Sequence, residues 1–158
     1  MLKEKKFIFL IFMFILVALV SAYIIEYGLG YKPCKLCVYE RVPYFLSIFL
    51  LIEILFFKRY KKITLLLLSL IFISSSILAF YHFGIEKNFF NESLVCSSNN
   101  ISETISKEEL LKQLSETSIS CKDVNFTIMG LSLASINLIF SLVLSVIFIK
   151  LFTNYGKN

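Results

Sequence analysis

The sequence contains no tryptophan and only two prolines, and no linker-like stretch separates its apolar segments. Because apolar segments recur along the whole chain, this absence argues against two domains and predicts a single membrane unit over residues 1–158. Charged residues are also few, at 17%, whereas 58% of the residues are hydrophobic. A soluble domain of this length cannot bury so large an apolar fraction, so we expect lipid to cover much of the surface.

The formal net charge of +5 raises the question of a nucleic-acid partner. Most basic residues, however, stand in short clusters beside the apolar runs, which is typical of membrane topology signals. The aromatic residues are mostly phenylalanines inside those runs. The pattern therefore predicts a membrane protein that binds no nucleic acid.

Four apolar segments predict the fold class, an all-α membrane protein with a four-transmembrane-helix bundle. A transmembrane helix needs about 20 predominantly apolar residues. The candidate segments are residues 7–25, 43–57, 63–83 and 126–152. The second is short and contains Glu53, whereas the third is the clearest of the four.

The first segment has an alternative interpretation as a signal peptide, because Val20-Ser21-Ala22 resembles a cleavage site. The run is long for the apolar core of such a peptide, so we favour a membrane span. Cleavage would leave the orientation of the remaining segments unchanged.

Small and polar residues mark a packing face on the fourth segment. Asn137, Ser141 and Ser145 line one stripe of the expected helix. Such stripes are common where membrane helices approach one another closely. We therefore expect this stripe to contact another helix.

Basic clusters orient the segments through the positive-inside rule. They precede the first segment, separate the second from the third and follow the fourth: Lys3, Lys5, Lys6, Lys58, Arg59, Lys61, Lys62, Lys150 and Lys157. All three clusters agree with a topology in which both termini are cytoplasmic. The periplasmic loops are then about residues 26–42 and 84–125.

The second outer loop contains a predicted short amphipathic helix. Ser106 and Glu109 fit the N-cap and N3 positions of a capping box. Leu110, Leu111 and Leu114 then share one side of the helix. We expect this helix to lie on the membrane surface or to pack on the bundle.

All four cysteines, Cys34, Cys37, Cys96 and Cys121, fall in the two outer loops. An even number of cysteines in an oxidising compartment favours disulfides. The C-x-x-C unit suits a redox-active site, because a helix N-terminus or the nearby cation of Arg41 would stabilise its thiolate. A Cys96–Cys121 disulfide would close a long, flexible loop, and such an exposed bond is open to attack by an external thiolate.

Two other interpretations of the cysteines remain open. A zinc site needs paired knuckles, and the sequence has only one C-x-x-C, so we predict no metal. Two inert structural disulfides would make the chain a non-catalytic membrane assembly factor. A disulfide across three residues beside a membrane stabilises little, which disfavours this interpretation.

The segment Pro-Cys-Lys-Leu-Cys-Val-Tyr-Glu-Arg at residues 33–41 resembles the P-C-x-L-C-x-x-x-R motif of the DsbB family of bacterial disulfide-forming membrane proteins. Tyr81-His82 and residues 126–133 resemble family elements at the outer ends of the third and fourth spans. Span number, cysteine order and loop lengths agree too, so the resemblance covers nearly the whole chain. It disfavours the vitamin K epoxide reductase type, in which the C-x-x-C lies late in the chain.

The resemblance implies a mechanism in which all four cysteines are catalytic. A periplasmic thioredoxin-like oxidase of the DsbA type would attack Cys96, and Cys121 would resolve the mixed disulfide. Electrons would pass to the pair formed by Cys34 and Cys37. From Cys37 they would reach ubiquinone or menaquinone in the bacterial inner membrane.

Two further residues are implied to line the quinone site. Arg41 would stabilise the thiolate and the reduced quinone, although a simple anchor at the lipid headgroups is the alternative. His82 is the sole histidine and would line the same pocket; its alternative is an ordinary interfacial residue.

Overall fold

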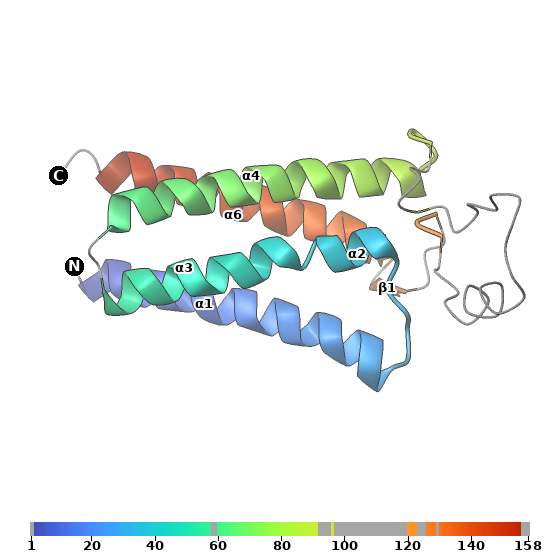
Figure 1. The fold of residues 1–158 in the computed structure, drawn as a ribbon, viewed down its shortest axis with the longest axis horizontal. Coiled ribbons are helices and arrows are strands. Elements are labelled where there is room, and N and C mark those ends of the chain that lie inside the picture. Colours follow the sequence, from blue (N-terminus) through green and yellow to red (C-terminus); the bar gives the residue numbers. More distant parts are fainter. Residues whose placement is uncertain are drawn as a thin grey trace, which may run out of the picture.

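The computed structural model describes residues 2–57, 60–91, 96, 120–122, 126–128 and 130–155. Most of these residues are helical (Figure 1). The long helices are α1 (Leu2–Tyr23), α3 (Val42–Phe56), α4 (Lys61–Glu86) and α6 (Leu133–Tyr155). The connection from α1 to α3 contains a π-helical turn, Ile24–Gly28, and the short helix α2, Lys35–Tyr39.

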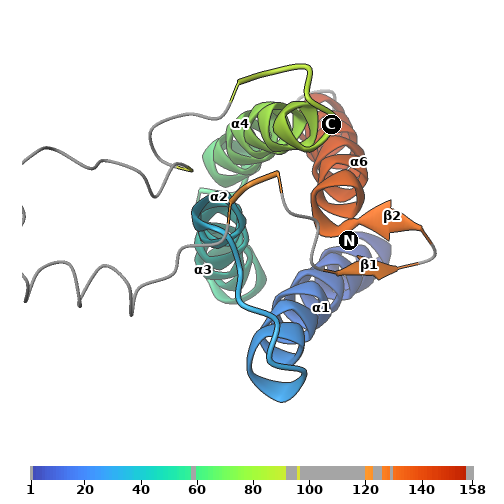
Figure 2. The same ribbon diagram turned by 90° about the vertical axis from the view of Figure 1, so that its right-hand side faces the viewer.

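The long helices run alternately up and down. The start of α1, the turn from α3 to α4 and the end of α6 lie at one end of the bundle, whereas α2 lies at the other (Figure 1). Viewed from that second end, the helices form a ring in which α1 packs on α3, α3 on α4 and α4 on α6 (Figure 2). The fourth side of this arrangement lies between α6 and α1, where the aromatic ring centroids of Phe14 and Phe140 are 5.1 Å apart.

Three helices among the described residues are long and apolar enough to cross a membrane: Lys5–Gly28, Lys61–Glu86 and Leu133–Tyr155. The prediction of a mostly helical membrane protein is therefore confirmed. The predicted second span does form a helix, α3, but its 15 residues are about 22 Å long. Because the hydrocarbon core of a bilayer is about 30 Å thick, the second predicted span, and with it the total of four, stays a prediction.

The last helix begins later than the sequence predicted. The strands β1 (Thr127–Ile128) and β2 (Leu131–Ser132) pair antiparallel where the sequence predicted the start of the fourth span. Gly130 in the turn has φ +82°, a left-handed conformation that ends any helix and favours glycine. The Ser132 hydroxyl then accepts a hydrogen bond from the Ser135 N–H, which caps the first turn of α6.

Some predictions fall outside the described residues. The amphipathic helix around Ser106 and Leu110 is one of them, and the basic residues Lys58, Arg59 and Lys157 are others.

The bundle core combines stacked aromatic rings with small hydroxyl side chains. Phe72 of α4 and Phe148 of α6 stack with ring centroids 5.5 Å apart. One level above, the hydroxyl oxygens of Ser75 and Ser141 are 3.0 Å apart, and both side chains are buried. Small side chains allow two helix backbones to approach closely. The predicted packing stripe on the fourth segment therefore does contact another helix, α4.

Replacing Ser75 with leucine is expected to destabilise the bundle by about 1–3 kcal/mol, because the larger side chain has no space between α4 and α6. The neighbouring Ser74 is exposed and bonds only within its own helix, to the carbonyls of Leu70 and Ile71. A Ser74→Leu variant should therefore change stability by less than about 0.5 kcal/mol. Thermal unfolding in one detergent compares the two, and equal shifts would contradict the tight α4–α6 contact.

Candidate redox site

The C-x-x-C unit folds into the start of α2. Cys34 has extended backbone angles and is the N-cap residue, so its sulfur accepts a hydrogen bond from the Cys37 N–H at 3.2 Å. One helical turn brings the two sulfurs to 2.7 Å from each other, and both are free thiols. Cys34 is buried and Cys37 is half-buried. A pair this close needs little movement to form a disulfide.

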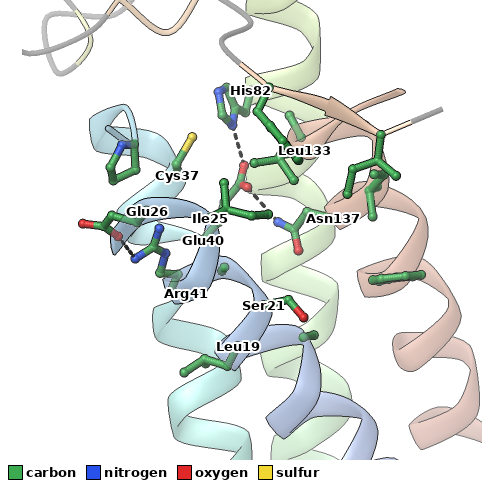
Figure 3. A pocket seen from close by; sticks show the side chains of 18 of the residues that line it. Leu19, Ser21, Ile25, Glu26, Cys37, Glu40, Arg41, His82, Leu133 and Asn137 are labelled. Carbon is green, nitrogen blue, oxygen red and sulfur yellow. Dashed lines mark hydrogen bonds and ion pairs between the residues drawn. The ribbon is translucent and has the colours of Figure 1, made fainter. Parts of the chain in front are cut away.

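The pair is contacted from α4 by His82, which the sequence had placed in the site. Its Nε2 atom lies 3.5 Å from the Cys34 sulfur, and its Nδ1 atom lies 2.8 Å from Oε1 of Glu40. The other carboxylate oxygen of Glu40 accepts a hydrogen bond from Nδ2 of Asn137 at 2.8 Å (Figure 3). The side chains of His82 and Glu40 are 2% and 8% exposed, so water screens this charged contact little.

Sequence reasoning missed Glu40 and the role of Asn137. Glu40 has no role in the sequence prediction beyond its place in the motif of residues 33–41, although an acid three positions after a redox cysteine, at a membrane boundary, was the available signal. Asn137 was assigned only to packing. In the structure it holds Glu40, which in turn holds the histidine ring.

A polar chain continues from Asn137 into the bundle. The Tyr44 hydroxyl donates to Oδ1 of Asn137 at 2.5 Å and lies 3.4 Å from the hydroxyl of Ser141. Ser141 then contacts Ser75 of α4. Because each of these buried polar groups has a partner, the network fixes the position of Glu40 relative to three helices.

The two thiols differ in acidity. The hydrogen bond from the Cys37 thiol lowers the pKa of Cys34 to about 5, opposed by burial and assisted by His82. The same contact, together with burial, raises the pKa of Cys37. Cys34 is therefore the thiolate of the reduced pair and Cys37 the thiol that donates to it.

The thiolate of Cys34 is expected to disappear only as the pH falls through about 5, because its contacts lower the pKa from the usual 9.0. Ultraviolet thiolate absorbance of the reduced protein, with Cys96 and Cys121 replaced by alanine, would measure this midpoint. The same titration of a variant that also carries Cys34→Ser is the control. A midpoint that stays near 9 would contradict the assignment of Cys34 as the thiolate.

The guanidinium of Arg41 donates a hydrogen bond to the Glu26 carboxylate (Figure 3). It also lies over the Tyr23 ring, 4.8 Å from the centroid. Among the described residues, the cationic side chain type that contacts the Cys34 sulfur is the imidazole of His82. Arg41 therefore ties α1 to the start of α3, and its predicted action on the thiolate stays a prediction.

The second cysteine pair is a disulfide between Cys96 and Cys121. We expected an exposed bond, but each residue is only 2% exposed. Both pack in one buried cluster with Cys34, Leu36 and Ile85. The expectation of exposure was wrong because apolar side chains of α2 and α4 cover the bond, and this packing puts the two cysteine pairs side by side.

A cavity of about 630 Å³ opens beside the first pair. Most of its wall is apolar and comes from α1 and α6, whereas Cys34, Cys37, Glu40, Arg41 and His82 line its polar end. Wall residues Val17 and Ile139 are also 60% and 49% exposed on the outside of the bundle. The cavity therefore reaches the surface on the side of the ring between α1 and α6.

Comparison with known proteins agrees with this site. The chain is similar to a protein of Rickettsia prowazekii (strain Madrid E) described as uncharacterized protein RP370, with 35% identity over 145 residues, covering 90% of this chain and 84% of that protein. Residues 4–151 match the family model described as disulfide bond formation protein DsbB. The match includes all four cysteines, His82 and Asn137. The chain therefore belongs to the DsbB family of disulfide-forming membrane proteins.

Proposed function

We propose that this protein is a quinone-dependent thiol oxidase that reoxidises a periplasmic thioredoxin-like protein of the DsbA type. The supporting observation is the buried cluster that joins Cys34, Cys96 and Cys121 at the polar end of an apolar cavity. Electrons would enter through the second pair and leave through the first. Membership of the DsbB family supports disulfide oxidoreductase chemistry in general.

The cavity fits a quinone. Its volume of about 630 Å³ lies within the usual range for small-molecule sites, and its apolar wall suits an isoprenoid tail. The polar end offers Arg41 and His82 as donors for the ring oxygens. When bound, a quinone would accept two electrons and two protons, and either ubiquinone or menaquinone satisfies this description.

Thiol exchange would proceed from the outer pair inward. A partner thiolate attacks Cys96, which forms a mixed disulfide and releases Cys121 as a thiolate. Attack of Cys121 on that mixed disulfide would only regenerate the starting bond. We therefore assign Cys121 another step in place of the resolving role that the resemblance implies: it attacks the neighbouring Cys34–Cys37 disulfide, forms a mixed disulfide with one of these cysteines and releases the other as a thiolate. The partner's second thiolate displaces Cys96 and leaves the partner oxidised. The Cys96 thiolate then attacks Cys121 in the inner mixed disulfide, which restores the Cys96–Cys121 bond and leaves Cys34 and Cys37 reduced.

His82, supported by Glu40, would accept and return the thiol proton of Cys34. The Nε2 atom of His82, 3.5 Å from the Cys34 sulfur, is placed to take the thiol proton. Glu40, at 2.8 Å from Nδ1, orients the ring and stabilises its charged form. Cys37 remains a hydrogen-bond donor to Cys34 until the two cysteines are oxidised together to their disulfide.

The proposal includes a topology in the bacterial inner membrane. Helix α3 would be a fourth, short span, extended at its outer end by α2. The start of α1 and the end of α6 lie at the end of the bundle opposite α2, and we assign that end to the cytoplasm (Figure 1). The cysteines are then periplasmic, as the basic clusters predict.

The test mixes purified protein, decylquinone and a reduced thioredoxin-like partner. Quinone absorbance and partner thiols are followed together, and two partner thiols are expected to be lost for each quinone reduced. A non-catalytic assembly factor would leave both unchanged. If the protein reduces no quinone, or reduces it equally well without its cysteines, the oxidase function is rejected.

A further inference from the structure

We propose that the reduced inner pair, Cys34 and Cys37, together with His82 forms a binding site for a thiophilic divalent ion of the Zn²⁺ class. The two sulfurs and one imidazole nitrogen of these residues all lie within 4.8 Å of one another. Two thiolates and one imidazole are the donors that Zn²⁺ prefers. The site needs no new segment, because α2 and α4 already bring the three groups together.

The surroundings of His82 favour ligation through Nε2. Glu40 lies 2.8 Å from Nδ1, so a proton on Nδ1 leaves the Nε2 lone pair facing the sulfurs. Metal-bound histidines almost always donate their other ring N–H to a carboxylate or carbonyl in this way. Asn137 holds the carboxylate from the opposite side at 2.8 Å, which keeps the imidazole in the ligating orientation.

Only a modest adjustment separates this arrangement from a metal site. Tetrahedral bonds of about 2.3 Å to two sulfurs place the sulfurs about 3.8 Å apart. In the reduced pair they are 2.7 Å apart, so Cys37 at the half-buried position must turn outward by about 1 Å. The cavity beside it provides that space, and a fourth ligand such as water would enter from the same side.

The charge balance also favours the ion. Once deprotonated, the two cysteines provide two anionic ligands for a divalent cation. Binding would release the thiol proton of Cys37 and the proton shared between Cys34 and His82, leaving two thiolates and a neutral imidazole around the cation. Oxidation of the pair to a disulfide removes both anionic ligands, so only the reduced state is competent.

The redox selectivity has a consequence for the enzyme. An ion that binds only the reduced pair stabilises that state by mass action. Each tenfold excess of the ion over its dissociation constant would raise the midpoint potential of the pair by about 30 mV. Zn²⁺ would thus keep the pair reduced and prevent electron transfer from it. This regulation rests on the proposed function, whereas ion binding does not depend on it.

The experiment uses the full chain in detergent with Cys96 and Cys121 replaced by alanine, reduced, freed of reductant and free of quinone. Titration with Co²⁺ as the probe is expected to give a thiolate-to-cobalt charge-transfer band, intense tetrahedral visible bands and one-to-one stoichiometry. Zn²⁺ should displace the Co²⁺ and abolish the bands. The same protein oxidised to the Cys34–Cys37 disulfide should give none of them.

Variants of the ligands and their support complete the test. Cys37→Ser and His82→Gln should lose the tetrahedral spectrum, and Glu40→Gln should weaken affinity about 10- to 100-fold. Glu53→Gln removes an acid at the other end of α3, where Glu53 accepts from Thr64 at 2.7 Å, and should leave affinity unchanged. Octahedral spectra, equal binding by the oxidised protein, or affinity indifferent to His82 would overturn the proposal. None of these readouts needs quinone or partner, so failure of the metal site is distinct from failure of the oxidase.

Discussion

A Cys37→Ser variant is expected to lose quinone reduction by at least about 10³-fold, whether the electron donor is a partner protein or a small dithiol. A single remaining thiol at Cys34 cannot form the intramolecular disulfide through which the pair releases two electrons. The sulfur contact of 2.7 Å indicates that the two residues act as one unit. Stopped-flow absorbance of the quinone under anaerobic conditions would measure the loss.

The matched control replaces the other pair. A Cys96→Ser/Cys121→Ser variant should lose oxidation of the partner protein but keep quinone reduction with a small dithiol that can reach Cys34 and Cys37. Because both pairs share one buried cluster, folding of each variant must be compared by thermal unfolding. Equal loss in both assays for both variants would contradict the assignment of separate tasks.

His82→Gln is expected to lower the quinone reduction rate near neutral pH by about 10²-fold, with a smaller loss for Glu40→Gln. Glutamine at position 82 removes the imidazole that contacts Cys34 and so raises the pKa of that thiol. Part of the lost rate should therefore return at alkaline pH, where the thiolate forms without help. Rates over a range of pH at saturating quinone would show the shift.

The acid control for this series is Glu53→Gln, because Glu53 of α3 accepts a hydrogen bond from Thr64 at the opposite end of the bundle. Its pH profile should match that of the wild type. If Glu40→Gln gives a uniform loss with an unchanged pH profile, Glu40 has only a structural role.

Hydropathy and charge could predict most of the scaffold, because a membrane helix is recognised from composition alone. Segments 7–25 and 63–83 fall inside the helices that are long enough to span. The start of α6 could not be predicted in this way, since no charged residue in positions 127–132 marks a boundary. Only the left-handed backbone of Gly130 separates the strand pair from the helix that follows.

The chemical details depended on tertiary structure that no local pattern contains. Asn137 and Glu40 are 97 positions apart and meet only because tertiary packing brings the end of α2 beside α6. The ion pair between Arg41 and Glu26, fifteen positions earlier, was also not predicted, because it depends on how the π-helical turn lies against the start of α3. The burial of Cys96 and Cys121 likewise depends on contacts with α2 and α4, which loop composition does not reveal.

The opening of the cavity between α1 and α6 has a consequence for how the enzyme meets its acceptor. Val17 and Ile139 belong both to the cavity wall and to the lipid-facing surface, so an acceptor dissolved in the bilayer would enter sideways. The quantity that sets its occupancy is then its mole fraction in the membrane and not its amount per volume of water. Apparent affinities measured in micelles would therefore change with detergent concentration, even when the protein and the acceptor are kept constant.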